Sequence, residues 1–128
     1  MDTINTNQLE NLLRNLIYRK IQSAHALDKH QRDLKFYVKY LKDLAISRRA
    51  LFHERLICGL NSPNLDDRIF DWKMAKRHMV RNKVKKEEYV RVLQEEVRRL
   101  KQQEKRIAEE LWYRAYLVRA REYLAGQQ

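Results

Sequence analysis

A heptad repeat of apolar residues runs through the second half of the chain, from Glu87 to Ala125. Charged residues fill most of its other positions, and it contains neither Gly nor Pro. Such a pattern is typical of a helix whose one narrow stripe packs on another helix. The stripe cannot bury itself, so the rest of the sequence has to supply its partner. Counting three and four alternately, its members are Val90, Leu93, Val97, Leu100, Glu104, Ile107, Leu111, Arg114, Val118 and Arg121.

A second stripe of the same kind lies in the first half of the chain. Leucine recurs in it every seven residues, at Leu27, Leu34 and Leu41. Asn7 and Glu10 have capping-box spacing, which predicts a helix start near residue 7. Counted three and four alternately, the members of this stripe are Ile17, Lys20, Ala24, Leu27, Gln31, Leu34, Val38, Leu41, Ala45, Arg48, Phe52 and Arg55.

One short segment between the stripes holds both interior helix breakers, Gly59 and Pro63. Gly59 suits the position after a helix, and Pro63 is tolerated in the first turn of the next. Asp66 and Asp67 complement the positive end of that new helix. The predicted boundaries are a tail over 1–6, a helix over 7–58, a turn over 59–66 and a helix over 67–125.

The predicted fold is all-α, with two long helices forming an antiparallel coiled-coil hairpin as a single domain over 1–128. Long helices joined by a short loop usually fold back on each other. The register places Ile17 opposite Ile107, so the two termini are expected to end nearly flush. No alternating runs bounded by turn signals predict a sheet.

The stripe is predicted to be weaker near the loop. Lys76, Lys83 and Lys86 fall on it there, and polar residues weaken packing unless their charged ends reach water. The stripe is therefore expected to shift toward Val80 and Val84 in this part of the helix.

Several features argue against a catalytic or metal site. Cys58 is the only cysteine, which excludes an intramolecular disulfide and fits a reducing compartment. The four histidines, at positions 25, 30, 53 and 78, have no metal-ligand spacing, and two helices enclose no cavity. Residues 1–6 have neither the basic nor the apolar region of a signal peptide, and no run in the sequence approaches the roughly 20 apolar residues of a membrane span. We expect a cytoplasmic protein that is not an enzyme, needs no cofactor or metal, and does not insert into a membrane.

The net charge of +11 attracts acidic protein surfaces, nucleic acid or anionic lipid, and its sign does not choose among them. Between Asp71 and Glu87 the chain has no acidic residue. This strip is either a contact surface for an acidic partner or phosphates, or a solvated helix face. Its seven basic residues are Lys73, Lys76, Arg77, Arg81, Lys83, Lys85 and Lys86.

Two clusters have the composition of interaction surfaces. Residues 111–123 combine four aromatic residues with three arginines, the residue types that dominate interface hot spots. The second cluster lies beside the loop, where large apolar groups have little core to enter. It consists of Leu65, Ile69, Phe70 and Trp72. The alternative is that both clusters only flank the stripe.

A short, basic two-helix hairpin with an aromatic and arginine-rich carboxy-terminal end resembles the central-stalk proteins of bacterial type III secretion systems, the FliJ/YscO family. The likeness is one of length, architecture and end composition, and is greatest from Lys105 to Tyr123. The resemblance implies a stalk whose paired termini enter the pore of the hexameric export ATPase, while its other end reaches the export gate.

We therefore expect a non-enzymatic stalk that couples the ATPase to the gate, stimulates ATP hydrolysis, and serves protein transport and bacterial virulence. Secretion chaperones are further expected partners, and nucleic acid is not. The alternatives are a basic nucleic-acid-binding coiled coil, and a scaffold or chaperone-binding module without an ATPase. From the chain's own chemistry, the expected ATPase contacts are Arg14, Arg19, Trp112, Arg114, Tyr116, Arg119 and Arg121. The expected gate contacts are Leu65, Ile69, Phe70 and Trp72.

Overall fold

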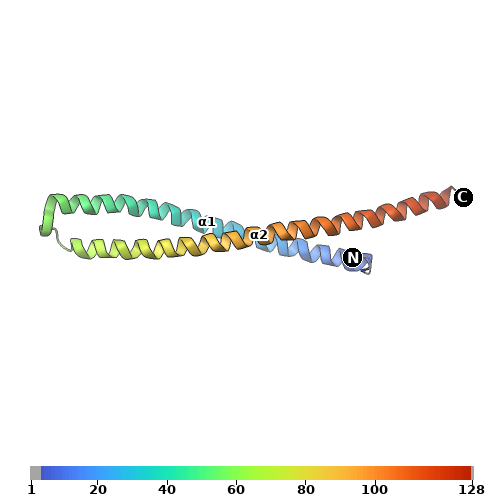
Figure 1. Cartoon of the computed structure of the whole chain (residues 1–128), viewed down its shortest axis with the longest axis horizontal. Coiled ribbons are helices and arrows are strands. Elements are labelled where there is room, and N and C mark those ends of the chain that lie inside the picture. Colours follow the sequence, from blue (N-terminus) through green and yellow to red (C-terminus); the bar gives the residue numbers. More distant parts are fainter. Residues whose placement is uncertain (1–3, 128) are drawn as a thin grey trace. The chain divides into compact units, whose positions relative to one another are not determined.

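Two long helices account for nearly all of the chain in the computed structural model, which describes residues 4–127 apart from the side chain of Leu60. Helix α1 spans Thr6–Cys58 and helix α2 spans Leu65–Gly126, with the short 3₁₀ helix η1, Gly59–Asn61, between them (Figure 1). Residues 4–127 contain no strand. The helices pack against each other, which confirms the predicted all-α hairpin.

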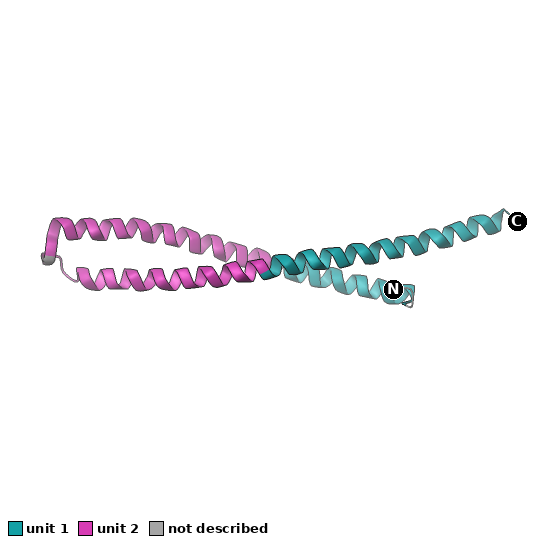
Figure 2. Ribbon diagram, in the orientation of Figure 1, with its two compact units in different colours: residues 1–26, 92–128 teal, residues 27–91 magenta. Residues whose placement is uncertain are grey.

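The chain divides into two compact units (Figure 2). Unit 1 takes the described residues of 1–26 and 92–128, and unit 2 takes residues 27–91. Each unit therefore contains one segment of α1 and one segment of α2.

A capping box starts helix α1. Asn5 Oδ1 accepts a hydrogen bond from the Gln8 backbone N–H at 2.8 Å, and Gln8 Oε1 accepts one from the Asn5 N–H at 3.1 Å. These bonds satisfy N–H groups that the helix leaves without partners. The predicted box of Asn7 and Glu10 is therefore wrong by two residues, although the chemistry of the cap is the expected one.

Two residues with positive φ make the connection between the helices. Gly59 has a φ of 59° and Asn64 a φ of 57°. Gly59 follows the last residue of α1, where the absence of a Cβ makes the left-handed conformation accessible. The Asn64 carbonyl accepts from the Arg68 N–H at 2.9 Å, so α2 begins two residues before the predicted start at 67. Asp66 and Asp67 lie in its first turn.

Unit 1 contains a continuous core of buried leucine and isoleucine side chains. Leu9 and Leu100 are both 0% exposed and pack with Leu16 and Ile107. Two of these residues come from each helix, so the core joins α1 to α2 within the unit. Burying such side chains is the main source of stability in a two-helix structure.

The register of unit 1 is the predicted one. Lys20 Nζ of α1 lies 2.6 Å from Glu104 Oε2 of α2. Lys20 is three residues after Ile17, and Glu104 is three before Ile107, so this ion pair has the register predicted for Ile17 and Ile107. Both partners are stripe positions, which means that this polar pair replaces an apolar contact between the helices.

Most of the predicted stripe of α2 is buried or half-buried, from Val90 to Arg114, whereas Val118 and Arg121 are exposed. In α1 the leucines at 27, 34 and 41 are half-buried as predicted, and so are Gln31 and Val38, but at three positions of the stripe the preceding residue is the buried one. At residue 44 the larger apolar side chain takes the inward position. At those three positions Leu16, Ser23 and Leu44 are buried, whereas the predicted Ile17 is half-buried and the predicted Ala24 and Ala45 are exposed.

Unit 2 places polar side chains on part of its stripe. Lys83 and Lys86 are half-buried, as their stripe positions predict, but Lys76 is exposed. Val80 and Val84 are also exposed, so the expected shift of the stripe toward them is wrong. The lysines stay on the stripe because their long side chains can bring the charged end to a partner or to water.

Helix α2 continues past the start of α1 in unit 1. Residues 4–6 line a shallow groove with Tyr113, Arg114 and Leu117, and no described residue of α1 lies farther along. The prediction that the termini end nearly flush is therefore wrong, because α2 has 62 residues and α1 has 53. We call residues 118–126, which run on beyond α1, the terminal arm (Figure 1).

Candidate functional site

Four residues near the end of α2 form one outward face, which we call the outer face. Trp112, Tyr116, Arg119 and Tyr123 follow the spacing i, i+4, i+7 and i+11, which keeps their side chains on one side of the helix. All four are exposed, and the rings of Trp112 and Tyr116 stack with centroids 5.7 Å apart. Exposed aromatic groups next to an arginine match the composition of interface hot spots.

Arg114 does not belong to the outer face. Its Nε donates to Glu110 Oε1 at 3.1 Å, its Nη1 lies 3.4 Å from the Thr6 hydroxyl, and its side chain is only 20% exposed. This guanidinium therefore connects α2 to the first turn of α1. Arg121 follows Arg114 by seven residues and so continues that side of the helix into the terminal arm, where it is exposed.

Arg14 and Arg19 lie on the α1 segment of unit 1, and both are exposed. Five residues separate them, which corresponds to about 140° around a helix, so they face different sides. Arg19 lines a groove between the helices that includes Leu12 and Ile107. Unit 1 thus contains all seven predicted ATPase contacts but distributes them over several faces. Tyr123 is not among these predicted contacts, although its spacing of eleven residues from Trp112 places it on the same side of the helix.

The four predicted gate contacts have very different environments in unit 2. Leu65 and Ile69 are 4% and 7% exposed, so the expectation that they have little core to enter is wrong. Trp72 follows them at helical spacing, is half-buried, and donates its indole N–H to the Leu44 carbonyl at 2.7 Å. Phe70 is 61% exposed and is the one member of this group that presents most of its side chain to solvent.

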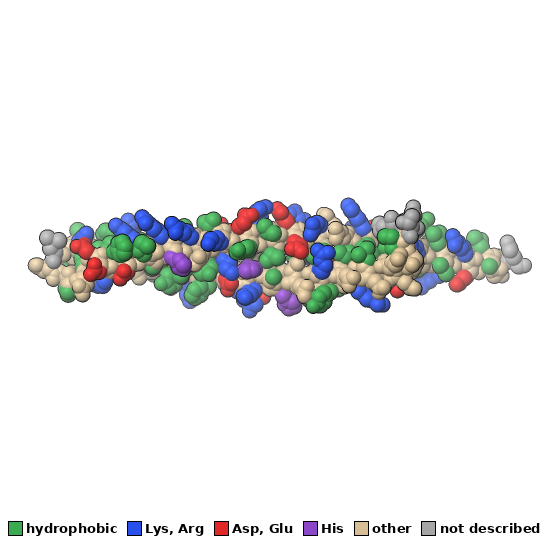
Figure 3. Space-filling view, turned by 90° about the horizontal axis from the view of Figure 1, so that it is seen from below, with side chains coloured by type: hydrophobic (Ala, Val, Ile, Leu, Met, Phe, Trp, Pro, Cys, Tyr) green, Lys and Arg blue, Asp and Glu red, His purple; other side chains and the backbone are tan. Residues whose placement is uncertain are grey.

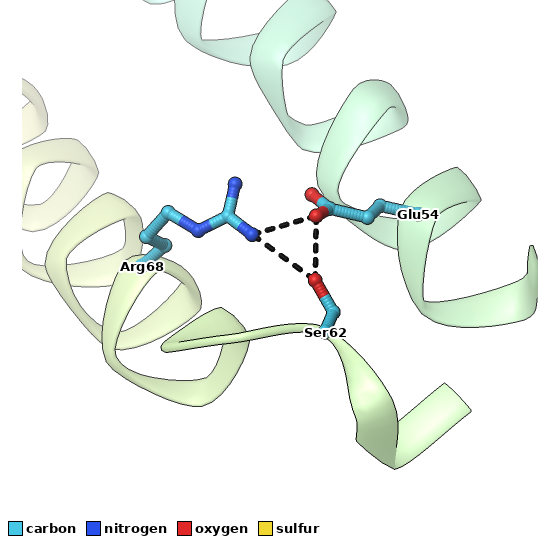
Figure 4. Close-up of polar contacts among 3 residues, drawn as sticks. All are labelled: Glu54, Ser62 and Arg68. Atoms are coloured by element: carbon cyan, nitrogen blue, oxygen red, sulfur yellow. Dashed lines mark hydrogen bonds and ion pairs between the residues drawn. The ribbon is translucent and has the colours of Figure 1, made fainter. Parts of the chain in front are cut away.

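A polar network that the sequence pattern did not predict holds the turn (Figure 4). Glu54 Oε1 accepts hydrogen bonds from the Ser62 hydroxyl at 2.6 Å and from Arg68 Nη2 at 2.7 Å. The bond from Arg68, followed by that from Ser62, lowers the pKa of Glu54, and Glu54 in turn raises the pKa of Arg68. Arg55 and Asp66 form a second ion pair across the same connection. The sequence signal for these pairs is the presence of opposite charges before and after the turn, Glu54 with Arg68 and Arg55 with Asp66.

Lys86 forms a second polar bridge between α1 and α2 in unit 2. Its Nζ lies 3.0 Å from Asp33 Oδ2 and 2.9 Å from His30 Nδ1. The hydrogen bond from Lys86 lowers the pKa of Asp33, and the His30 ring stacks on Tyr89. The polar stripe residue therefore has specific partners on α1, which pattern counting along one helix could not identify.

Within residues 4–127, no group of His, Cys, Asp or Glu side chains is placed to hold a metal ion. None of the described helices has a stretch both long enough and apolar enough to span a membrane. Comparisons with protein-family models, with curated proteins and with solved structures gave no match.

Proposed function

We propose that this chain is the non-enzymatic central stalk of a type III secretion system, coupling the hexameric export ATPase to the export gate and stimulating ATP hydrolysis. The observation that carries the proposal is the outer face on a helix that continues alone as the terminal arm. A single helix is about 10–12 Å wide and suits entry into the pore of a ring. Stacked aromatics and arginines suit carboxylates and backbone carbonyls that line such a pore.

The proposed ATPase contacts are the outer face together with Arg121. Arg114 has a positioning role, because its bonds to Glu110 and Thr6 hold α2 against the start of α1. A contact through exposed cations is weakened by salt, so we expect weak, salt-sensitive association rather than a permanent complex. Weak association suits a stalk that must not stay bound to one subunit of the ATPase ring.

In this proposal the gate contact lies at the loop end of unit 2 and is centred on Phe70. Of the four predicted gate contacts, Phe70 is the one with a largely exposed side chain, since Leu65 and Ile69 are buried and Trp72 is half-buried. The protein works in the cytoplasm without membrane insertion, and secretion chaperones are additional partners. Phe70→Ala is expected to reduce secretion while ATPase stimulation persists.

The test of the proposed function is ATP hydrolysis by the cognate export ATPase with and without this protein. Arg119→Glu combined with Arg121→Glu is expected to remove the stimulation. The matched control is Arg98→Glu with Lys101→Glu, which makes the same charge change on exposed α2 residues of unit 1 outside the arm. Control and wild type are expected to stimulate equally. Full stimulation by the arm variant would contradict the proposal.

A basic nucleic-acid-binding coiled coil is the second candidate function, and the net charge of +11 favours it. Neutralising several phosphates makes affinity fall steeply with salt. If the arm variant stimulates the ATPase normally but loses steeply salt-dependent binding to duplex DNA, this second function replaces the first. A scaffold or chaperone-binding module would show neither stimulation nor binding to DNA.

A further inference from the structure

We propose that a groove on α2 in unit 2 is a docking site for an acidic amphipathic helix of a partner protein. The groove shares no residue with the outer face, and the proposal holds whether or not the chain is a secretion stalk. Its lining combines two apolar side chains with four cations: Trp72, Val80, Lys73, Lys76, Arg77 and Arg81.

None of the four cations of the groove has a carboxylate partner in the described part of the chain. Among residues 4–127, no Asp or Glu oxygen lies within the 4.0 Å of an ion pair from any of the four. Two basic residues, one on either side of the groove along α2, are paired instead, Arg68 with Glu54 at 2.7 Å and Lys86 with Asp33 at 3.0 Å. The difference arises because the chain has no acid between Asp71 and Glu87 and α1 places none close to these four. The groove therefore carries positive charge that a partner can neutralise.

The apolar part of the groove is accessible along one side of α2. Trp72, Lys76 and Val80 are spaced four residues apart, so they follow one another on the same side of the helix. Val80 is 42% exposed, although valine is a residue type that proteins commonly bury. Hydrophobic and basic side chains lie next to one another on the face of the molecule shown in Figure 3.

This combination matches the two faces of an acidic amphipathic helix. Such a helix would place its apolar stripe on Trp72 and Val80 and its flanking carboxylates beside the cations. Arginine can accept a carboxylate through two parallel hydrogen bonds, which orients the partner as well as attracting it. Both the charge and the apolar surface of the groove are used in this arrangement.

The geometry of Trp72 favours a protein partner over nucleic acid. Its indole N–H is bonded to the Leu44 carbonyl, and two cations already lie over its ring, Arg48 at 5.9 Å and Lys76 at 5.4 Å from the centroid. Single-stranded nucleic acid binds by stacking bases face to face on aromatic rings, so a base would compete with these cations for the ring, whereas apolar side chains need only its exposed part. Phosphates would meet the cations but would gain nothing from the exposed side chain of Val80.

The test uses three fluorescent probes with the full chain. The first is a synthetic helix with leucines along one face and glutamates beside them, and the second is the same composition scrambled so that the faces are lost. The third is duplex DNA of equal net charge. We expect anisotropy to show the ordered peptide binding at least about tenfold more tightly than the scrambled one.

Two matched variants locate the site. Lys73→Glu with Arg77→Glu is expected to weaken the ordered peptide by about tenfold or more. The control is Lys35→Glu with Lys39→Glu, which reverses two exposed lysines of α1 at the same spacing and is expected to bind nearly as wild type. Val80→Ser tests the apolar part of the groove and should weaken binding of the ordered peptide more than binding of the scrambled one. Circular dichroism confirms that each variant remains helical.

Three outcomes would overturn the proposal. An equal loss in the control variant would mean that net charge alone attracts the peptide. Equal binding of the two peptides would mean that the apolar part of the groove has no role in binding. Tighter binding of duplex DNA, abolished by the groove variant, would assign the groove to nucleic acid. None of these measurements involves an ATPase, so they can fail or succeed independently of the stalk.

Discussion

At the scale of single residues, Glu54 links stability to pH. Its two hydrogen bonds lower its pKa from the ordinary 4.5, so the folded chain binds this proton less readily than the unfolded chain. The stabilisation is complete above the ordinary pKa and is lost as pH falls through the lowered one. We expect denaturant titrations from about pH 6 to about pH 3 to show a smaller loss of stability in Glu54→Gln than in the wild type.

The matched control for Glu54 is Glu122→Gln, which changes an exposed carboxyl of the terminal arm. Asp33 also has a lowered pKa, and its contribution is the same in both variants, so the comparison between them isolates the contribution of Glu54. If the stability of Glu54→Gln falls with pH as much as that of the wild type, the network at the turn does not contribute to the pH dependence of stability.

Lys83 and Lys86 occupy similar half-buried positions, but we predict opposite effects for their replacement by leucine. Lys83 pairs at 3.6 Å with Glu87 of its own helix, so Lys83→Leu should be neutral or stabilising in urea unfolding. Lys86→Leu removes both bonds to α1 and leaves the Asp33 carboxylate beside an apolar side chain, so it should destabilise. If Lys83→Leu is the more damaging change, the stripe of unit 2 has been misassigned.

At the scale of helices, the cost of truncating a leucine is expected to follow its burial. Leu100 is fully buried, so Leu100→Ala should lower the free energy of unfolding by roughly 2–5 kcal/mol. Leu27 is half-buried, and Leu27→Ala should cost less than Leu100→Ala. Leu124→Ala, on the exposed arm, should stay within about 0.5 kcal/mol of the wild type. Equal losses at all three positions would contradict the expected dependence on burial.

At the scale of the whole molecule, the antiparallel arrangement can be tested by spin labels at Ile17 and Ile107. Cys58 is exposed and must first be replaced, as Cys58→Ser. Packed helices have axes about 8–10 Å apart, so the labels should be in near contact. Dilution with unlabelled protein excludes pairs from two molecules. A single extended helix would separate these positions by about 135 Å, which would rule out the hairpin.

The sequence alone determined the helices, the turn and the register of unit 1. Apolar periodicity specifies which side of a helix is buried, and Gly59 and Pro63 mark where helices stop, because these are local properties of the chain. The tertiary structure decided which of two neighbouring residues turns inward, as with Leu44 in place of Ala45. Counting along one helix defines its buried side only approximately, and the position of the other helix selects the residue.

Tertiary structure alone also decided which candidate residues are available to a partner. Leu65 and Ile69 enter the core of unit 2 while Phe70 remains exposed, although all three are large, apolar and close in sequence. The partners of Lys86 lie 53 and 56 residues away, so sequence spacing could not reveal them. Burial and pairing depend on which side chains of the other helix lie opposite each position, and only the folded hairpin determines this.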